Sequence, residues 1–262
     1  MKTKPVSVIV SVLFIMSFIS IACGAQAIAE PTSTPLPTAT KTLVPTATFT
    51  ATATPRPTRT PNLAATQRAE ELNAEAQKYV DLGYLSSAEG KFEEYDDFSL
   101  EWAQMNWYDF EILGQSEGEF FISAHAKWSS AYRNANVSGC GYVFGLQANG
   151  DHFAVFLDRS KILFLNADYS TSNYSYPVGL TRGKGSVKFE NPADNPVEAD
   201  FTLIVKGSYA YILVDGEVIG EYTLPQNRLT GGIVALSLLS GTNKDFGTRC
   251  EMTNVHAFFS EN

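Results

Sequence analysis

Four residues with reactive or charged side chains gather in one loop near the end of the chain. Lys244, Asp245, Arg249 and Cys250 lie within the stretch LSLLSGTNKDFGTRCEMTN, just before the last apolar run. A Cys beside charged groups can act as a nucleophile, a charged rim can hold a ligand carboxylate, and a Cys can also form a disulfide. The loop is therefore an active site, a ligand rim or a disulfide-stapled corner.

The first 23 residues have the layout of a secretory signal peptide. Two lysines precede an apolar run over residues 6–22 that ends in small residues. A membrane span is the alternative, but no basic stop-transfer flank follows the run. The stretch FISIACGA resembles a bacterial lipoprotein box, which implies a lipidated Cys23, whereas AQA offers ordinary cleavage after Ala27. Because Cys23 ends the apolar run, we favour lipidation and predict an exported protein anchored to the outer face of the bacterial membrane.

Cysteine usage favours the disulfide interpretation of the loop. With Cys23 lipidated, Cys140 and Cys250 are left in an exported domain, where an oxidising compartment favours pairing. A bridge would close a loop of about 110 residues, for which the chain-entropy model gives roughly 4 to 5 kcal/mol of stabilisation. Two free buried thiols are the alternative. We predict the disulfide, and we keep Arg249 as a candidate ligand for a sugar carboxylate, although a structural role for it is favoured.

Two segments separate the signal peptide from the main domain. Thr and Pro supply most positions of residues 31–61, and no apolar periodicity is present, which predicts a disordered tether over residues 24–61. In polyproline II form it would reach on the order of 100 Å. Residues 62–94 form a helix and a connector, since small and apolar residues recur at spacings of three and four between Asn62, a capping residue, and Gly83. We favour a helix packed on the domain or standing as a stalk over a coiled coil, because its core positions are mostly Ala.

Beyond about residue 100 the apolar period changes from helix to strand. The stretch EFFISAHAKW alternates strictly, and similar runs follow at short intervals. They are GYVFGLQA, HFAVFLD, KILFLN, SVKFE, ADFTLIVKG, SYAYILVDG, EVIGEYTL, GGIVALSLL and MTNVHAFFS. The dipeptides Asn149-Gly150 and Asp215-Gly216 are typical of tight hairpins. With no helix between these runs, the pattern predicts an all-β, antiparallel two-sheet sandwich over residues 95–262.

Four stretches also carry a family resemblance. They are YDDFSLEW, GYVFGLQANGDHFAVFLD, ADFTLIVKGSYAYILVDGEVIGEYTL and MTNVHAFF. In their residue patterns and their order along the chain they resemble the concanavalin A-like (laminin G-like) jelly-roll superfamily. The whole chain is similar to bacterial lipoproteins that join a Thr/Pro tether to such a domain. The resemblance implies a jelly-roll sandwich from roughly Tyr95 onward. Many members carry an Arg after the G-aromatic-x-F strand, but Gly145 occupies that place, so the role of that Arg does not transfer.

We predict that the protein is not an enzyme. Glycosidases of this superfamily need two carboxylates that converge across a sugar ring, in an acid-x-acid-x-x-acid spacing that no predicted strand has. The acidic residues over 93–97 fall in a connecting segment and indicate a solvated face. A glycoside-acting enzyme is the least favoured alternative, because distant loops can also assemble a site.

The sequence also predicts no metal site and no cofactor. His125, His152 and His256 lie on separate predicted strands without metal-ligand spacing, so each is interpreted as an ordinary surface or half-buried residue. Calcium is the one cofactor with any signal, a weak one, from the oxygen atoms of Asp194 and Asn195.

Aromatic residues provide the candidate ligand contacts, because sugars commonly stack against aromatic faces. Tyr174 and Tyr176 lie in the polar stretch DYSTSNYSYPVG, together with Tyr169, and are the first choice. Trp107, in MNWYDF beside Tyr108, is a further candidate, although tryptophans in a sandwich are most often core residues.

Net charge excludes some partners. One acidic and five basic residues precede Leu63, so 27 acidic and 14 basic residues follow, a net charge of −13. Such a domain is a poor partner for nucleic acid or anionic lipid, and membrane association is expected only through the lipid anchor. We therefore expect a surface-anchored, non-catalytic module that binds a glycan or cell-wall polymer. A structural or protein-contacting adhesion scaffold is the alternative.

Overall fold

The computed structural model describes residues 62–169, 173–175, 180–183, 185–225 and 231–261. These residues belong to one unit, which runs from Arg59 to Asn262. The predicted signal peptide, Cys23 and the tether fall within residues 1–61 and lie outside the described residues. In the part of the chain that is described, no helix is long and apolar enough to cross a membrane.

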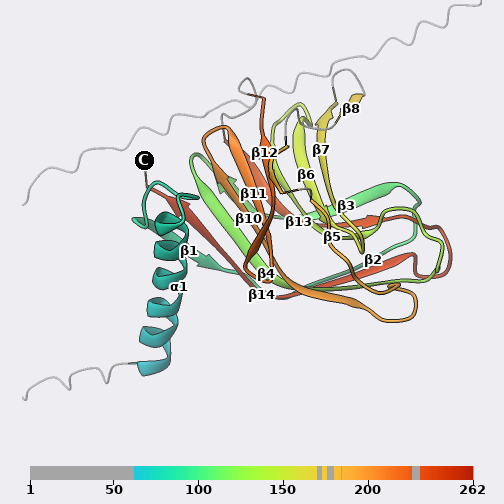
Figure 1. Cartoon of the computed structure of the whole chain (residues 1–262), viewed down its shortest axis with the longest axis horizontal. Helices are drawn as coiled ribbons and strands as arrows, with labels where there is room; N and C mark the ends of the chain where they lie inside the picture. The colour runs from blue at the N-terminus through green and yellow to red at the C-terminus, as the bar shows by residue number, and fades with distance from the viewer. Residues whose placement is uncertain (1–61, 170–172, 176–179, 184, 226–230, 262) are drawn as a thin grey trace, which may run out of the picture. The chain divides into compact units, whose positions relative to one another are not determined.

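One helix and 14 strands make up the described elements, and every strand pairing is antiparallel (Figure 1). They are α1 (Leu63–Asp81), β1 (Gly90–Glu94), β2 (Phe98–Trp102), β3 (Trp107–Ser116), β4 (Phe120–Ser130), β5 (Gly139–Leu146), β6 (His152–Leu157), β7 (Ile162–Asp168), β8 (Asn173–Ser175), β9 (Leu180–Gly183), β10 (Val197–Lys206), β11 (Tyr209–Val214), β12 (Glu217–Thr223), β13 (Gly232–Ser240) and β14 (Thr248–Ser260).

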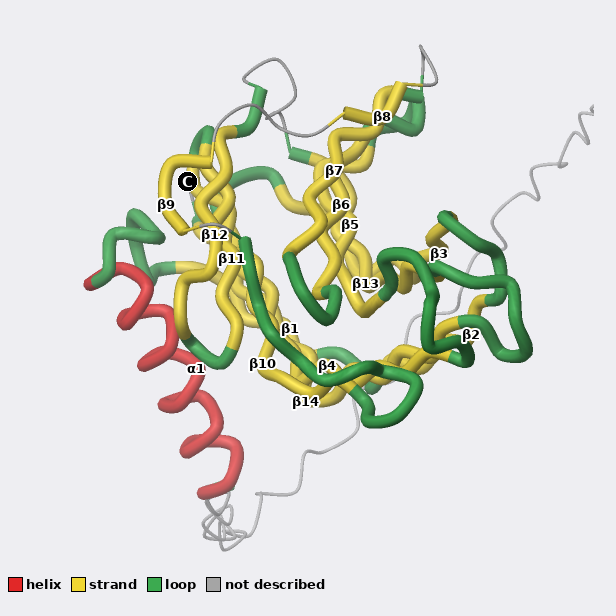
Figure 2. Tube along the Cα trace, turned by 45° about the vertical axis from the view of Figure 1, so that its right-hand side comes forward, coloured by secondary structure: helices red, strands yellow, loops and turns green. Residues whose placement is uncertain are grey.

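The strands form two sheets that pack face to face. One sheet has the order β1-β14-β4-β10-β11-β12-β9, with β2 also paired to β14, and we call it the helix-side sheet. The other has the order β3-β13-β5-β6-β7-β8, and we call it the six-stranded sheet. Figure 2 shows the two sheets as separate layers. The predicted antiparallel jelly-roll sandwich is therefore confirmed.

The core lies between the two sheets and follows from strand alternation. On β10, Phe201, Leu203 and Val205 enter the core, and Tyr142 meets Phe201 from the opposite sheet with the ring centroids 5.0 Å apart. The buried Tyr142 hydroxyl donates a hydrogen bond of 2.6 Å to the Phe201 carbonyl. Its polar atom is thus satisfied inside an apolar core, which makes the burial of a Tyr acceptable there.

Helix α1 begins and ends where the sequence predicts. The Asn62 side chain accepts a hydrogen bond from the Ala65 amide at 3.3 Å, and Gly83 takes a positive φ of 79° just past the helix. The buried face packs on the outer surface of the helix-side sheet, where Tyr79 meets Phe121 with the ring centroids 5.0 Å apart. Since the helix packs on this sheet, it belongs to the domain.

Several details differ from the sequence pattern, and the strands β2, β3, β8 and β9 all lie outside the runs predicted as strands. A strand, β1, begins at Gly90 inside the segment expected to be a connector, because its pairing with β14 compensates for a run in which only Phe92 is apolar. The run SVKFE forms a single bridge, between Ser186 and Lys161, instead of a strand. At Asp215-Gly216 both residues have positive φ, as expected for a tight hairpin, whereas at Asn149-Gly150 only the Gly does.

The predicted disulfide joins the two sheets through the core. Cys140 on β5 and Cys250 on β14 are bonded, with their Cα atoms 5.4 Å apart, and both are fully buried. The disulfide interpretation of the C-terminal loop is confirmed, so neither thiol is available as a nucleophile.

Gly139, which precedes Cys140, occupies a position that an alanine does not fit. Its φ is 150°, and an added Cβ would lie 2.0 Å from the Leu157 carbonyl oxygen. We expect Gly139→Ala to lower the free energy of unfolding by about 2 kcal/mol, measured by urea denaturation. Gly207→Ala is the matched control, because Gly207 also has a positive φ but an added Cβ there meets nothing within 4 Å. Equal losses in the two variants would contradict the steric explanation.

Candidate functional site

A cleft of about 610 Å³ opens on the outer face of the six-stranded sheet. Strand alternation creates its apolar floor: on β6, Val155 enters the core between the sheets, while Ala154 and Phe156 point to the outer face. The apolar side chains that line the cleft above them are Phe110, Val137, Leu163, Leu165 and Leu239. The cleft is thus built on the rigid centre of a sheet.

Aromatic side chains form the walls of the cleft. Trp107 is 46% exposed and Tyr169 is 50% exposed, which is unusual for such large rings in a folded domain. Tyr169 packs on Gly150, where an added Cβ would lie 3.0 Å from the ring. Tyr169 and Tyr108 each lie about 6 Å from the His152 ring, at centroid distances of 6.0 and 5.7 Å. These contacts hold the tyrosines in place before any ligand arrives.

A hydrogen-bond chain orients the Tyr108 hydroxyl. His152 Nδ1 lies 2.7 Å from the Gly150 carbonyl oxygen, which can only accept, so we assign the Nδ1 proton to this contact. In neutral His152, Nε2 then accepts from the Tyr108 hydroxyl at 2.5 Å. Tyr108, which lines the cleft, is therefore the donor in this hydrogen bond.

Polar side chains stand around the apolar floor. Asn136 donates to Asn106 Oδ1 at 2.9 Å, and both residues line the cleft. The buried carboxylate of Asp158 accepts from the Ser138 amide at 3.3 Å and from the Ser160 amide and hydroxyl at 3.1 and 2.9 Å. Asp158 thus fixes the turn between β6 and β7, which also carries Arg159 and Lys161 into the lining.

The structure places the predicted ligand residues in different surroundings. Trp107 lines the cleft. Tyr174 lies on β8, paired with Ala167 at the edge of the same sheet, but its side chain and all of Tyr176 are outside the described residues. Arg249 is not part of the cleft: it forms an ion pair with Glu101, directly opposite on β2, and stacks over the Phe246 ring at 4.8 Å.

Several residues of the cleft carried no clear sequence signal. Asn106, Asn136, Asp158, Arg159 and Lys161 come from three connections that lie far apart along the chain. The stretch DRSK, between two apolar strands, is the signal that was available, because a charged hairpin turn at the end of a sheet is well placed to contact ligands.

Trp102 and Trp128, the other two tryptophans, lie in the core, as expected for tryptophans in a sandwich. Trp128 is 1% exposed and Trp102 is half-buried, and both pack in the core between the sheets. Trp107 differs: it is the first residue of β3, at the edge of the six-stranded sheet, and is 46% exposed.

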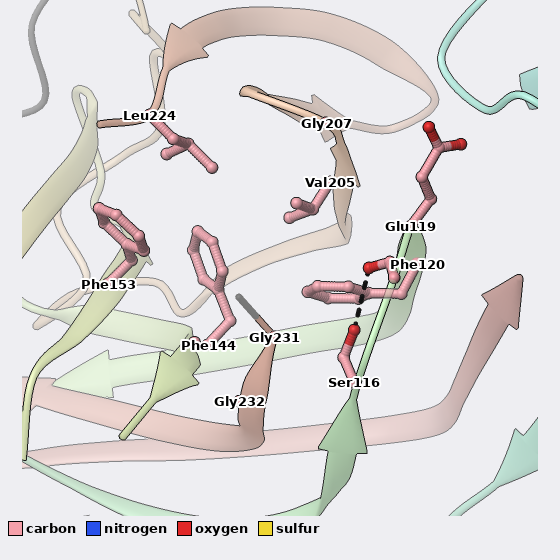
Figure 3. A pocket seen from close by; sticks show the side chains of 12 residues that line it. Ser116, Glu119, Phe120, Phe144, Phe153, Val205, Gly207, Leu224, Gly231 and Gly232 are labelled. Atoms are coloured by element: carbon pink, nitrogen blue, oxygen red, sulfur yellow. Dashed lines mark hydrogen bonds between the residues drawn. The ribbon is translucent and has the colours of Figure 1, made fainter. Parts of the chain in front are cut away.

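A second cavity, of about 290 Å³, lies between the sheets, and Figure 3 shows it from close by. Phe120, Phe144, Phe153, Val205 and Leu224 line it, and their side chains point toward one another. Gly231 also lines this cavity and adjoins residues 226–230, which lie outside the described residues. The described residues that line it are mostly apolar, with Ser116 and Glu119 as the polar side chains, so it offers a ligand fewer polar partners than the cleft does.

The stretch GQSEG over residues 114–118 has the G-x-S-x-G spacing of a hydrolase nucleophile elbow. That motif requires a strand-to-helix turn and a nearby base, whereas Ser116 ends β3, and β4 follows after a short turn. The Ser116 hydroxyl donates to the Gly118 carbonyl at 3.1 Å (Figure 3). The structural context of a nucleophile elbow is thus missing at this serine.

Histidines lie under helix α1, in a polar cluster on the outer face of the helix-side sheet. His256 is 5% exposed; its Nε2 lies 2.7 Å from Glu75 on the helix, and its Nδ1 lies 2.9 Å from the Asn254 carbonyl. The more exposed His125 contacts Asp200 and Glu198, at 2.8 and 3.2 Å. The hydrogen bond to Asp200 is the largest of the effects that raise the pKa of His125. The interpretation as a surface or half-buried residue is therefore wrong for His256, which is a buried partner of the helix, and also for His152, which is 2% exposed.

The candidate calcium ligands already have protein partners. Asp194 forms an ion pair with Arg133, and the Asn195 amide donates to Glu190. Among the described residues, no group of three or more His, Cys, Asp or Glu side chains is arranged to hold a metal ion.

Comparison with known proteins gives similarity in fold only. No protein-family model matches the chain, and no curated protein does. A fructosyltransferase from A. japonicus is 12% identical with a TM-score of 0.43, the match covering 67% of this chain and 27% of the enzyme. The carbohydrate-binding module CBM66 from Bacillus subtilis is 8% identical (TM-score 0.42, 65% and 96% covered), and the Bacillus licheniformis β-glucanase is 13% identical (TM-score 0.38, 66% and 93% covered). At these values the similarities carry no functional argument.

Proposed function

We propose that the protein binds a saccharide, without turning it over, in the cleft on the six-stranded sheet. The observation that carries this proposal is the pair of half-exposed rings, Trp107 and Tyr169, that line a cleft with an apolar floor. A pyranose ring has apolar C–H faces that stack on such rings, and hydroxyl groups that need donors and acceptors around them.

The polar lining matches the second requirement of a sugar. The Tyr108 hydroxyl, Asn106 and Asn136 offer both donors and acceptors at the cleft, and existing hydrogen bonds hold them in place. Groups that are already ordered lose little conformational entropy when a ligand binds. Export and lipid anchoring at Cys23, which belong to the same proposal, concern residues outside the described part of the chain.

Replacing the exposed rings should abolish most of the affinity. We expect Trp107→Ala and Tyr169→Ala each to weaken binding by about 10-fold or more, because each removes a stacking face at the centre of the contact. The measurement is a glycan-array screen with and without calcium, followed by calorimetric titration of the best saccharide. Tyr209→Ala is the matched control, since Tyr209 is 39% exposed on β11 of the other sheet.

The outcomes of this experiment separate the alternatives. Binding lost in Tyr174→Ala and Tyr176→Ala but retained in Trp107→Ala would move the site to the edge of the sheet near β8. A folded protein that binds no saccharide on the array would contradict the proposal and favour the adhesion scaffold. Turnover of a bound saccharide would contradict the non-catalytic part alone.

A further inference from the structure

The charges in the cleft are opposite in sign to the charge of the domain. From Leu63 onward the chain has 27 acidic and 14 basic residues. The charged residues that line the cleft are Asp158, Arg159 and Lys161, so cations outnumber anions there. Both cations lie in the turn between β6 and β7, on either side of Ser160.

The one acidic side chain in the lining is turned inward. Asp158 is 5% exposed, and its two carboxylate oxygens accept the hydrogen bonds from Ser138 and Ser160 described above. Arg159 is half-buried and Lys161 is exposed. The positive groups are therefore the charges that a ligand in the cleft meets first.

Neither cation has an acidic partner in the part of the chain that the structure describes. Within the described residues, the side chains of Arg159 and Lys161 make no ion pair and no hydrogen bond. Five of the nine other cations with described side chains form ion pairs, in the contacts Arg68–Glu94, Lys91–Glu93, Lys127–Glu198, Arg133–Asp194 and Arg249–Glu101. Arg159 and Lys161 are therefore available to an anionic group of a ligand in the cleft.

We propose that the saccharide bound in the cleft is anionic, and that Arg159 and Lys161 bind its carboxylate or sulfate groups. The inference rests on the proposed function and names its ligand class. A guanidinium binds a carboxylate or sulfate through two parallel N–H donors, whereas the Lys ammonium supplies a mobile point charge. At physiological salt, charges are screened within about 8 Å, so the two cations act on the ligand more strongly than the acidic residues of the distant faces.

The test compares ligands that differ only in charge. The purified full-length protein is titrated with oligogalacturonate and its methyl ester, and with sulfated and desulfated carrageenan oligosaccharides, which contain no carboxylate, beside a glycan array that holds acidic and neutral saccharides. We expect the saccharides that bind to be acidic, their neutral forms to bind about 10-fold more weakly or less well still, and binding to weaken as salt is raised. The pair of acidic ligands distinguishes carboxylate from sulfate recognition.

Matched variants assign the effect to the two cations. Arg159→Gln with Lys161→Gln should weaken binding of acidic saccharides by about 10-fold or more. Lys244→Gln is the control, because Lys244 is an exposed cation outside the cleft. Circular dichroism confirms that the variants are folded.

Each result decides something different. Saccharides that bind equally well with and without their anionic groups would overturn this inference and leave the proposed function intact. Acidic saccharides that bind equally well to the double variant would overturn the role of Arg159 and Lys161. Absence of binding to every saccharide would remove the proposed function, and this inference with it.

Discussion

Replacing Cys140 and Cys250 together by Ala should lower the free energy of unfolding by about 2 to 5 kcal/mol. The bond closes a loop with a sequence separation of 110 residues, so its loss gives the unfolded chain much more conformational freedom. The sulfur atoms also fill space at the centre of the core, where a smaller side chain leaves a cavity. The measurement is urea denaturation monitored by tryptophan fluorescence.

The reduced natural protein is the control that separates the effect of the covalent disulfide from the effect of the space that the sulfur atoms fill. Reduction should cause most of the loss without changing any residue, and the single variant Cys140→Ala should resemble the double variant. Unchanged stability after complete reduction would show that the link between β5 and β14 adds nothing to the folded state.

Breaking the buried pair of Glu75 and His256 should have the next largest effect on stability. We expect His256→Gln to lower the free energy of unfolding by about 3 kcal/mol near pH 5.5. The pair holds helix α1 on the sheet, at a distance of 2.7 Å. Both ring nitrogens of His256 face acceptors, since Nδ1 contacts the Asn254 carbonyl, so the doubly protonated ring fits the site. Removing it leaves the Glu75 carboxylate without its partner in a largely buried place.

The pair also makes stability depend on pH. Burial alone would lower the pKa of His256, but the hydrogen bond and charge of Glu75 outweigh it and raise this pKa above 6.5. The stabilisation is thus complete below pH 6.5 and is lost as pH rises through the raised pKa. Burial also opposes ionisation of Glu75, but the hydrogen bonds from His256 and Tyr79 and the charge of His256 outweigh it and lower the pKa of Glu75 below 4.5. The stabilisation that ionised Glu75 contributes is therefore present above pH 4.5 and is lost as pH falls through the lowered pKa. The pair stabilises most between pH 4.5 and 6.5.

Denaturation at a series of pH values tests this dependence. The natural protein should lose stability as pH rises above 6.5, and His256→Gln should lose less over the same range. His125→Gln is the matched control, because His125 lies on the same face but is more exposed, where ion pairs are worth at most about 1 kcal/mol. An unchanged slope in His256→Gln would assign the pH dependence to other groups.

Local features of the fold were predictable because local physics determines them. The cap at Asn62, the helix end at Gly83 and the turn at Asp215-Gly216 each depend on a few neighbouring residues. The disulfide was predicted from the expected export of the domain, because two cysteines that remain in an oxidising environment tend to pair with each other. The strand at Gly90–Glu94 was missed because its pairing with β14 comes from the far end of the chain.

The cleft was predictable only in part, because distant segments build it. Trp107 was a candidate because of its residue type. Arg159 and Lys161 could not be selected from the sequence, because they line the cleft only through the packing of the turn between β6 and β7 beside β3 and the connection before β5. For Arg249 a structural role was favoured over ligand binding, and its ion pair with Glu101, opposite it in the register of β14 with β2, agrees with that role. Whether a charge is free depends on pairing across strands, which spacing along the chain does not reveal.

Helix α1 and the cleft lie on opposite outer faces of the sandwich, which has a consequence for how the domain can be displayed. The chain enters the domain at Leu63, at the start of a helix packed on the helix-side sheet (Figure 2). The cleft opens on the six-stranded sheet. Under the proposed anchoring, the chain thus enters the domain on the face away from the cleft. Copies anchored side by side in this way, with the proposed saccharide site, could contact one long polymer together and bind it by avidity even where each single contact is weak.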